Sequence, residues 1–148
     1  MEVLDQPTQL KLLFRASEYQ FSSQSFHNKC DDTEDTLTLI LTEHGKTIGG
    51  FTHYKWNEVS NKYVRGDRDK AFLIQLDRKE KMVPQEENHL IYCSREWGPS
   101  FGDDDIFIDD SCHKNENSCA FFPNSYNREG KDQYERGQDS YKRFSGAI

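Results

Sequence analysis

A β-hairpin at residues 36–56 constrains the fold more than any other stretch of the chain; its sequence is TLTLILTEHGKTIGGFTHYKW. Leu37, Leu39 and Leu41 alternate with Thr36, Thr38 and Ile40. This is the period of a β-strand, and it marks the stretch as an element of the core. A turn at residues 43–46 contains Gly45, and a second β-rich run follows at residues 47–54. The sequence therefore predicts an antiparallel hairpin.

Two glycines, Gly49 and Gly50, lie inside the second run of the hairpin. Glycine weakens a strand, so its presence there marks a β-bulge or the close approach of another group, such as a crossing aromatic ring. A phosphate-binding loop would need a helix directly after the glycines, and the sequence offers none. Both structural explanations stay open at this point.

Two short helices are expected before the hairpin. Residues 10–14 are apolar enough for one or two helical turns. Ser22 is a suitable N-cap for a helix at residues 23–30, in which Phe21 and Phe26 would pack as a hydrophobic staple. These helices would flank the sheet that contains the hairpin.

Further short strands follow the hairpin. Residues 71–76, 89–93 and 106–108 fit strands, whereas residues 56–69 and 78–88 fit polar connections and residues 96–102 fit a turn that packs on the core. From Ser111 on the apolar residues thin out, and residues 127–146 fit a long surface loop. Strands joined by turns favour antiparallel pairing. At 148 residues the chain is expected to form a single domain, 1–148, of mainly β (α+β) class: two antiparallel sheets packed as a β-sandwich with short flanking helices.

The charge of the chain limits the partners that it can have. The net charge is −7, and residues 101–119 hold six acidic residues against one lysine. Such a domain is a poor nucleic-acid binder, because non-specific affinity comes from neutralising phosphates. Residues 61–81 carry seven basic against four acidic residues, which keeps a nucleic-acid-binding regulator of stress genes as an alternative. No apolar run is long enough for a signal peptide or a membrane span, so a soluble, cytoplasmic protein without membrane insertion is expected.

The residues that could carry chemistry are aspartates and cysteines. The candidate binding residues are Asp103, Asp104, Asp105 and Asp109. Their spacing lacks the glycine and the glutamate of a calcium-binding loop, so a solvated acidic loop is the better interpretation. The candidate redox residues are Cys30, Cys93, Cys112 and Cys119, which a reducing compartment would keep as free thiols. Their spacing does not support zinc, and no catalytic residue, metal or cofactor is predicted.

Several stretches, taken in order, resemble the TLDc domain of eukaryotic oxidation-resistance proteins. They are LKLLFRASEYQFSSQSFHNKC, the hairpin, DKAFLIQL, GPSFGDDDIFIDDSC and NENSCAFFPNSY. The resemblance as a whole covers about residues 9–145. The most specific part is the strand with two glycines, followed by the KAFL strand and then by G-x-x-F-G.

The resemblance implies a fold and a function. It implies a two-sheet sandwich in which Gly49, Gly50 and Gly102 let backbone segments pack closely. Family members are linked to protection against oxidative stress, and several bind the vacuolar proton-pumping ATPase and alter its assembly. The resemblance attaches no enzymatic reaction to the fold.

The chain departs from the family pattern in two places. Asp103–Asp105 replace a run that is usually rich in glycine, which makes the loop anionic. The final strand that the family forms after residues 140–147 is expected to be missing, and the unpaired sheet edge would favour pairing with a second copy or another chain.

The leading hypothesis is a non-enzymatic interaction module of the oxidative-stress response that binds the vacuolar proton-pumping ATPase. A peroxide-reactive thiol protein or an enzyme is the alternative from a different class.

Overall fold

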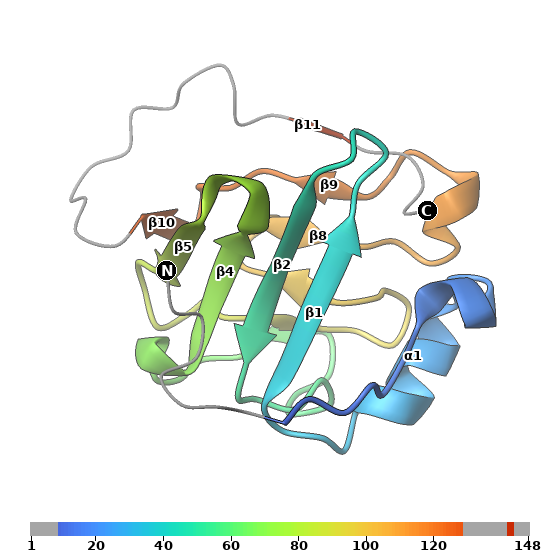
Figure 1. Cartoon of the computed structure of the whole chain (residues 1–148). Helices are drawn as coiled ribbons and strands as arrows, with labels where there is room; N and C mark the ends of the chain where they lie inside the picture. Colours follow the sequence, from blue (N-terminus) through green and yellow to red (C-terminus); the bar gives the residue numbers. More distant parts are fainter. Residues whose placement is uncertain (1–8, 129–141, 144–148) are drawn as a thin grey trace.

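A five-stranded antiparallel sheet packs on a second layer of antiparallel strands to form a sandwich (Figure 1), and the computed structural model describes residues 9–128 and 142–143. The first sheet consists of β1 (Thr36–Leu41), β2 (Thr47–Thr52), β4 (Ala71–Gln75), β5 (Glu80–Pro84) and β10 (Tyr126–Arg128). The second layer consists of β3 (Lys62–Tyr63), β6 (Tyr92–Cys93), β7 (Ser100–Phe101), β8 (Ile106–Phe107), β9 (Cys119–Ala120) and β11 (Lys142–Arg143). The predicted fold class is therefore confirmed.

The strand order differs from the order in the chain. The first sheet has the order β1-β2-β4-β5-β10, and the second layer holds the sheet β11-β9-β8-β7 and the pair β3-β6. An isolated antiparallel bridge pairs Ile91, directly before β6, with Phe101 of β7. The strands of the second layer run across those of the first in Figure 1. This arrangement brings the β3-β6 pair next to β7 and β8.

The helices lie around the sandwich. α1 (Ser23–Cys30) begins at Ser22, whose side chain accepts a hydrogen bond from the Ser25 backbone N–H, as the N-cap prediction requires. The remaining helices are short 3₁₀ turns: η1 (Ala16–Tyr19), η2 (Arg68–Lys70), η3 (Leu76–Arg78) and η4 (Cys112–Lys114). Phe26 of α1 packs edge-to-face on Trp56, which fixes the helix to the core. No helix within the described ranges has the length and apolar character that crossing a membrane requires.

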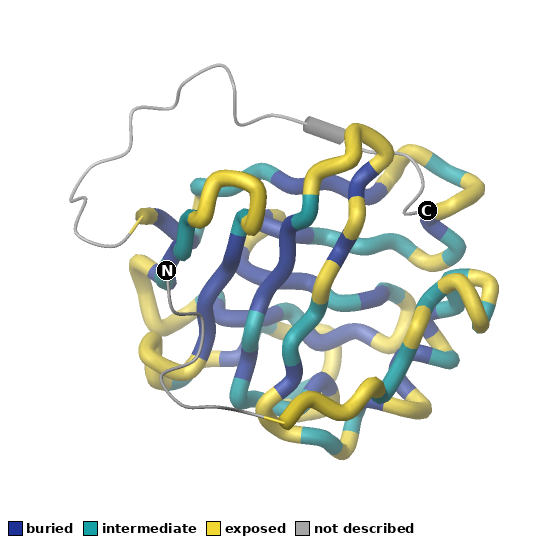
Figure 2. Tube along the Cα trace, viewed as in Figure 1, coloured by how far each residue is buried: buried dark blue, intermediate teal, exposed yellow. Residues whose placement is uncertain are grey.

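Aromatic rings fill the centre of the core. Phe101 and Tyr126 are fully buried and Trp56 is 1% exposed. The Tyr126 hydroxyl donates to the Leu90 carbonyl at 2.6 Å, and the Trp56 indole N–H donates to Thr36 Oγ1 at 3.1 Å. Each buried polar group of these large side chains thus has a partner, as a core of this kind requires. Figure 2 shows the buried residues concentrated between the layers.

The hairpin forms as predicted, but its leucines do not face the core. β1 and β2 pair in regular register from Thr36 with Thr52 to Leu41 with Thr47, without a bulge. Leu39 and Leu41 are 55% and 46% exposed, whereas Ile40 is buried at 6%. The face of β1 that carries Thr36 and Ile40 is the inner one. Thr36 accepts the indole hydrogen bond of Trp56 on this face. The more polar face of the alternation is therefore the buried one.

Three stretches before Ser111 differ from the sequence predictions. Residues 10–14 form no helix; Leu10 and Leu12 are 66% exposed, while Leu13 and Phe14 pack on the core from an extended segment. The predicted connection 78–88 contains β5, because Met82 and Pro84 are buried. The predicted polar loop 56–69 contains β3.

The segment after Ser111 is also more regular than predicted. It contains β9 and β10, whose buried residues include Ala120, Tyr126 and the polar Asn127. The predicted loop 127–146 is thus wrong at its start, where β10 pairs with β5, and at Lys142–Arg143, where β11 pairs with β9. The rest of that loop, and the predicted absence of a final strand after residues 140–147, lie outside the described residues.

Candidate functional site

The acidic segment after β7 does not act as one cluster, because its aspartates have different environments. Asp105 is fully buried, and its carboxylate accepts hydrogen bonds from the backbone N–H groups of Asn124, Ser125 and Tyr126 at 2.7, 2.7 and 3.1 Å. Burial raises the pKa of this carboxyl to about 6, although the three N–H donors act in the opposite direction. Asp105 therefore anchors the start of β10 rather than facing a partner.

Asp109 and Asp110 are also engaged within the chain. Asp109 Oδ2 accepts a hydrogen bond from Asn117 Nδ2 at 2.8 Å. Asp110 Oδ1 accepts the Ser23 backbone N–H at 2.7 Å, at the first turn of α1, and this bond lowers the pKa of Asp110. A carboxylate at this end of a helix stabilises it. Of the predicted binding residues, Asp105 and Asp109 thus have structural partners.

Asp103 and Asp104 are exposed, as is Asp110, but Asp110 is bound to the first turn of α1. Asp103 and Asp104 lie in the tight turn between β7 and β8, where Gly102 and Asp104 have φ angles of +63° and +64°. Asp103 Oδ1 accepts the hydroxyl of Tyr63 at 2.6 Å. Burial and the charge of Asp103 both raise the pKa of Asp104. Neither carboxylate forms an ion pair with any residue that the structure describes, so within that part of the chain the two negative charges of the turn are unpaired.

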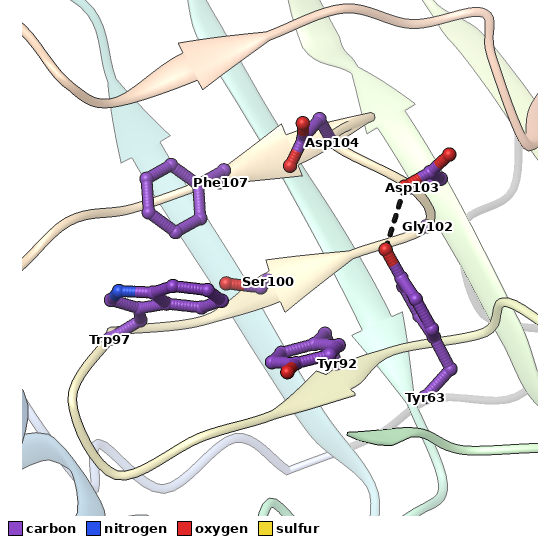
Figure 3. Close-up of a pocket in the computed structure, with 8 residues that line it drawn as sticks. All are labelled: Tyr63, Tyr92, Trp97, Ser100, Gly102, Asp103, Asp104 and Phe107. Atoms are coloured by element: carbon purple, nitrogen blue, oxygen red, sulfur yellow. Dashed lines mark hydrogen bonds between the residues drawn. The ribbon is translucent and has the colours of Figure 1, made fainter. Parts of the chain in front are cut away.

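A pocket of about 220 Å³ lies beside this turn, and aromatic rings form most of its wall (Figure 3). It is lined by Tyr63, Tyr92, Trp97, Ser100, Gly102, Asp103, Asp104 and Phe107. The Tyr63 and Tyr92 ring centroids lie 4.9 Å apart, those of Tyr92 and Trp97 5.3 Å, and those of Trp97 and Phe107 5.0 Å. The four rings form a continuous series along the pocket.

The strands explain why these rings face outward. Ile91 and Cys93 are buried at 0% and 1%, so the alternation of β6 turns Tyr92 to the opposite face. β3 pairs with β6 in a register that places Tyr63 opposite Tyr92. Phe107 follows the fully buried Ile106 in β8 and is likewise turned outward. The outer face of the second layer is therefore aromatic at this point.

Trp97 is held by a contact with α1. The Trp97 carbonyl lies 2.8 Å from His27 Nε2, and His27 Nδ1 lies 2.5 Å from Asp31 Oδ1. His27 is 2% exposed, so both contacts are shielded from water. A carbonyl can only accept, so Nε2 carries the proton that it donates to the Trp97 carbonyl. This chain of bonds fixes the loop that carries Trp97.

Electrostatics at the pocket are negative. Burial and the hydrogen bond to Asp103 raise the pKa of Tyr63, so its hydroxyl stays neutral and acts as a donor. The faces of aromatic rings carry negative quadrupole charge. The lining residues include no Lys, Arg, His or Cys. The rings and carboxylates that line the pocket can bind and orient a group.

Glycines make close packing possible at three positions. A Cβ atom on Gly50 would lie 2.6 Å from Cζ of Phe101. The Phe101 ring therefore crosses β2 at this glycine, which is the second of the two explanations given for the glycine pair. A Cβ atom on Gly102 would collide with the Asp105 carboxylate. At Gly49 it would collide with the Thr38 carbonyl of the neighbouring strand. All three glycines therefore lie at close contacts.

The four cysteines are free thiols and all are buried. Burial raises the pKa of Cys30 to about 11 and also raises the pKa of Cys93. The Cys93 thiol donates to the Lys55 carbonyl at 3.8 Å. Among the residues that the structure describes, no three His, Cys, Asp or Glu side chains gather as a metal site.

The sequence did not reveal the pocket. The sequence pointed to Asp103 and Asp104. The aromatic rings of the pocket, however, come from β3, β6, the loop after β6, and β8, and only the fold brings these segments together. Trp56, the other tryptophan of the chain, is buried in the core and does not line the pocket. The signal that could have located Tyr92 is its place between the buried Ile91 and Cys93.

Comparison with known proteins places this architecture in a family. The family model of the TLDc domain matches residues 2–139. No curated protein and no solved structure gives a significant match. Because the family model covers nearly the whole chain, the chain belongs to the TLDc domain family.

Proposed function

We propose that this TLDc domain is a non-enzymatic protein-interaction module of the oxidative-stress response, that it works in the cytoplasm, and that its partner is the vacuolar proton-pumping ATPase. The match to the TLDc family over residues 2–139 is the observation that carries the proposal. The family is linked in general to oxidative stress, and several of its members bind this pump. Binding to this pump is therefore the specific activity to test.

The environment of the thiols supports an interaction module over a peroxide-reactive protein. The thiolate is the species that reacts with peroxide, and reactive thiols lie in partly exposed, electropositive surroundings. Here all four thiols are buried, and burial raises the pKa values of Cys30 and Cys93. A fold built to react through these residues would lower those pKa values instead.

The surface of the second layer supplies a place for a partner. The pocket and the charges of Asp103 and Asp104 lie together on it. Aromatic side chains are enriched at protein interfaces, and charged rims steer association. The other strongly charged stretch, residues 61–81, has part of its basic charge engaged within the chain. Arg68 donates to the Gln85 carbonyl, and Lys81 lies over the Phe72 ring.

Binding of the purified chain to the purified peripheral sector of the proton pump tests the proposal. Interferometry with the chain immobilised should give saturable binding. The Asp103→Asn/Asp104→Asn variant should bind more weakly than the wild type. A matched control is Glu86→Gln/Glu87→Gln, which removes the same two charges from exposed positions.

Each outcome of this experiment has a distinct meaning. Saturable binding that only the first variant weakens supports the proposal. Absence of binding to the pump sector overturns the choice of partner. Equal weakening by both variants shows that overall charge, rather than this surface, is responsible. Removal of Asp105 is not a suitable variant, because that residue holds the fold.

A further inference from the structure

The pocket between β6 and β8 has the features of a site for a cation. Four aromatic rings wall it, and the exposed carboxylates of Asp103 and Asp104 stand at its rim. A cation over an aromatic face is attracted by the ring quadrupole, and a nearby carboxylate adds direct attraction. An anionic group would be repelled by both. The charge at the rim therefore selects a positively charged occupant over an acidic or neutral one.

The chain itself supplies no occupant among the residues that the structure describes. The five ion pairs within the described ranges involve neither Asp103 nor Asp104. The hydroxyl of Tyr63 occupies Oδ1 of Asp103, which leaves the other oxygen of that carboxylate and both oxygens of Asp104 as acceptors. The pocket also holds Ser100, whose hydroxyl oxygen retains acceptor capacity while it donates to the Gly98 carbonyl at 3.2 Å.

The shape of the lining favours a planar cation. Tyr92 and Trp97 are tilted by 34° to each other and form one wall, and Figure 3 shows Phe107 and Asp104 across from them. A guanidinium group is flat, so it can stack on a ring while its edge donates to carboxylate oxygens in the same plane. An ammonium group is a strongly hydrated point charge that cannot stack in this way. A volume of about 220 Å³ has room for such a side chain.

We propose that the pocket formed by Tyr63, Tyr92, Trp97 and Phe107, with Asp103 and Asp104 at its rim, binds an arginine side chain of a protein partner. The guanidinium lies on the Trp97 and Tyr92 rings and donates to Asp104 and to the open oxygen of Asp103. The assignment of this arginine to a protein partner rests on the proposed function as a protein-interaction module. The arginine preference of the pocket is independent of which protein that partner is.

Peptides that differ in one side chain test this proposal without the proton pump. Short, uncharged glycine-serine peptides carry a central arginine, lysine, citrulline or phenylalanine, and binding to the full chain is followed by ¹H–¹⁵N NMR titration. The arginine peptide should shift the indole N–H signal of Trp97 with a dissociation constant on the order of a millimolar. Citrulline has the shape of arginine without its charge and should bind at least about tenfold more weakly. Lysine should lie between the two.

Variants show whether the rings and the rim act together. Trp97→Ala and Asp104→Asn should each weaken arginine binding at least about fivefold, whereas Glu86→Gln should have no effect. Trp97→Phe keeps an aromatic ring and should retain most of the binding, which controls for loss of folding in Trp97→Ala. Retained binding by a folded Trp97→Ala variant overturns the proposal.

The remaining peptide outcomes also decide the question. Equal binding of citrulline or phenylalanine means an uncharged groove, and binding of lysine as tightly as arginine removes the guanidinium assignment. Either result overturns the proposal. If the arginine peptide binds as described but the pump sector does not, the pocket stands and only the choice of partner fails. If the pump sector binds and the arginine peptide does not, the pocket assignment fails alone.

Discussion

Replacement of Asp105 by alanine tests whether this buried carboxylate holds the fold. The change removes the acceptor for three backbone N–H groups, on Asn124, Ser125 and Tyr126. A buried donor without a partner costs about 1–3 kcal/mol; one of these three hydrogen bonds is buried and two are partly buried, so the loss of all three costs at most about 6 kcal/mol. Removing the buried charge offsets part of this cost. The pKa of Asp105 is about 6 in the folded chain against an ordinary value of 3.8, and this difference means that burying the ionised carboxylate costs about 3 kcal/mol at neutral pH. The expected net loss at neutral pH is therefore at most about 3 kcal/mol.

The loss should depend on pH in a direction that the pKa fixes. The pKa of Asp105 is higher in the folded chain than in the unfolded chain, so the folded state binds more protons between about pH 4 and about pH 6. The contribution of Asp105 to stability therefore falls as the pH rises through this window. The alanine variant has no such titration. The difference between wild type and Asp105→Ala should shrink by about 2 kcal/mol from about pH 4 to about pH 7.

Urea denaturation at both pH values measures these differences. Asp104→Asn is the matched control, because Asp104 is exposed and asparagine tolerates its positive φ angle. The control should stay within about 0.5 kcal/mol of the wild type. A loss below about 1 kcal/mol for Asp105→Ala, or a difference that grows with pH, would contradict the role assigned to Asp105.

Three further predictions follow from the fold. Gly50→Ala should destabilise the chain by about 1–3 kcal/mol in thermal denaturation because its Cβ atom meets the Phe101 ring, and an unchanged melting temperature would refute this contact. Leu39→Thr should change the free energy of unfolding by less than about 0.5 kcal/mol, whereas Ile40→Ala should cost about 2–5 kcal/mol; the reverse order would place the leucines in the core. Cys30 should resist modification by a thiol reagent in the native state and react only on unfolding, because its pKa is about 11 and it is buried, so rapid native labelling would restore the thiol hypothesis.

Local signals made some elements predictable from the sequence. Ser22 caps α1 through its own side chain, and this interaction depends only on neighbouring residues. The hairpin was likewise indicated by its period and its turn. Its buried face was not, because Thr36 becomes a core residue only through its hydrogen bond to Trp56, twenty residues away. The period of a strand does not show which face a distant aromatic residue will cover.

Other elements depend on contacts that no local pattern contains. β5 begins with Glu80 and Lys81 and ends with Pro84, a composition typical of a connection, yet it is fixed between β4 and β10. Asp105 has the same side chain as its two neighbours, and only the turn at Gly102 carries it inward to the backbone of residues 124–126. The negative charge of the candidate site could therefore be predicted from the sequence. The sequence did not show that Asp105 anchors the fold whereas Asp103 and Asp104 stand at the rim of the pocket.

The most direct test of the proposed interaction surface is competition at the proton pump. Binding of the wild-type chain to the purified peripheral sector is measured with and without the arginine peptide, next to Asp103→Asn/Asp104→Asn and Glu86→Gln/Glu87→Gln. The peptide and the first variant should each weaken binding, the variant by at least about tenfold, and the control variant should bind like the wild type. Binding that neither the peptide nor the Asp103→Asn/Asp104→Asn variant reduces would show that the partner uses another surface.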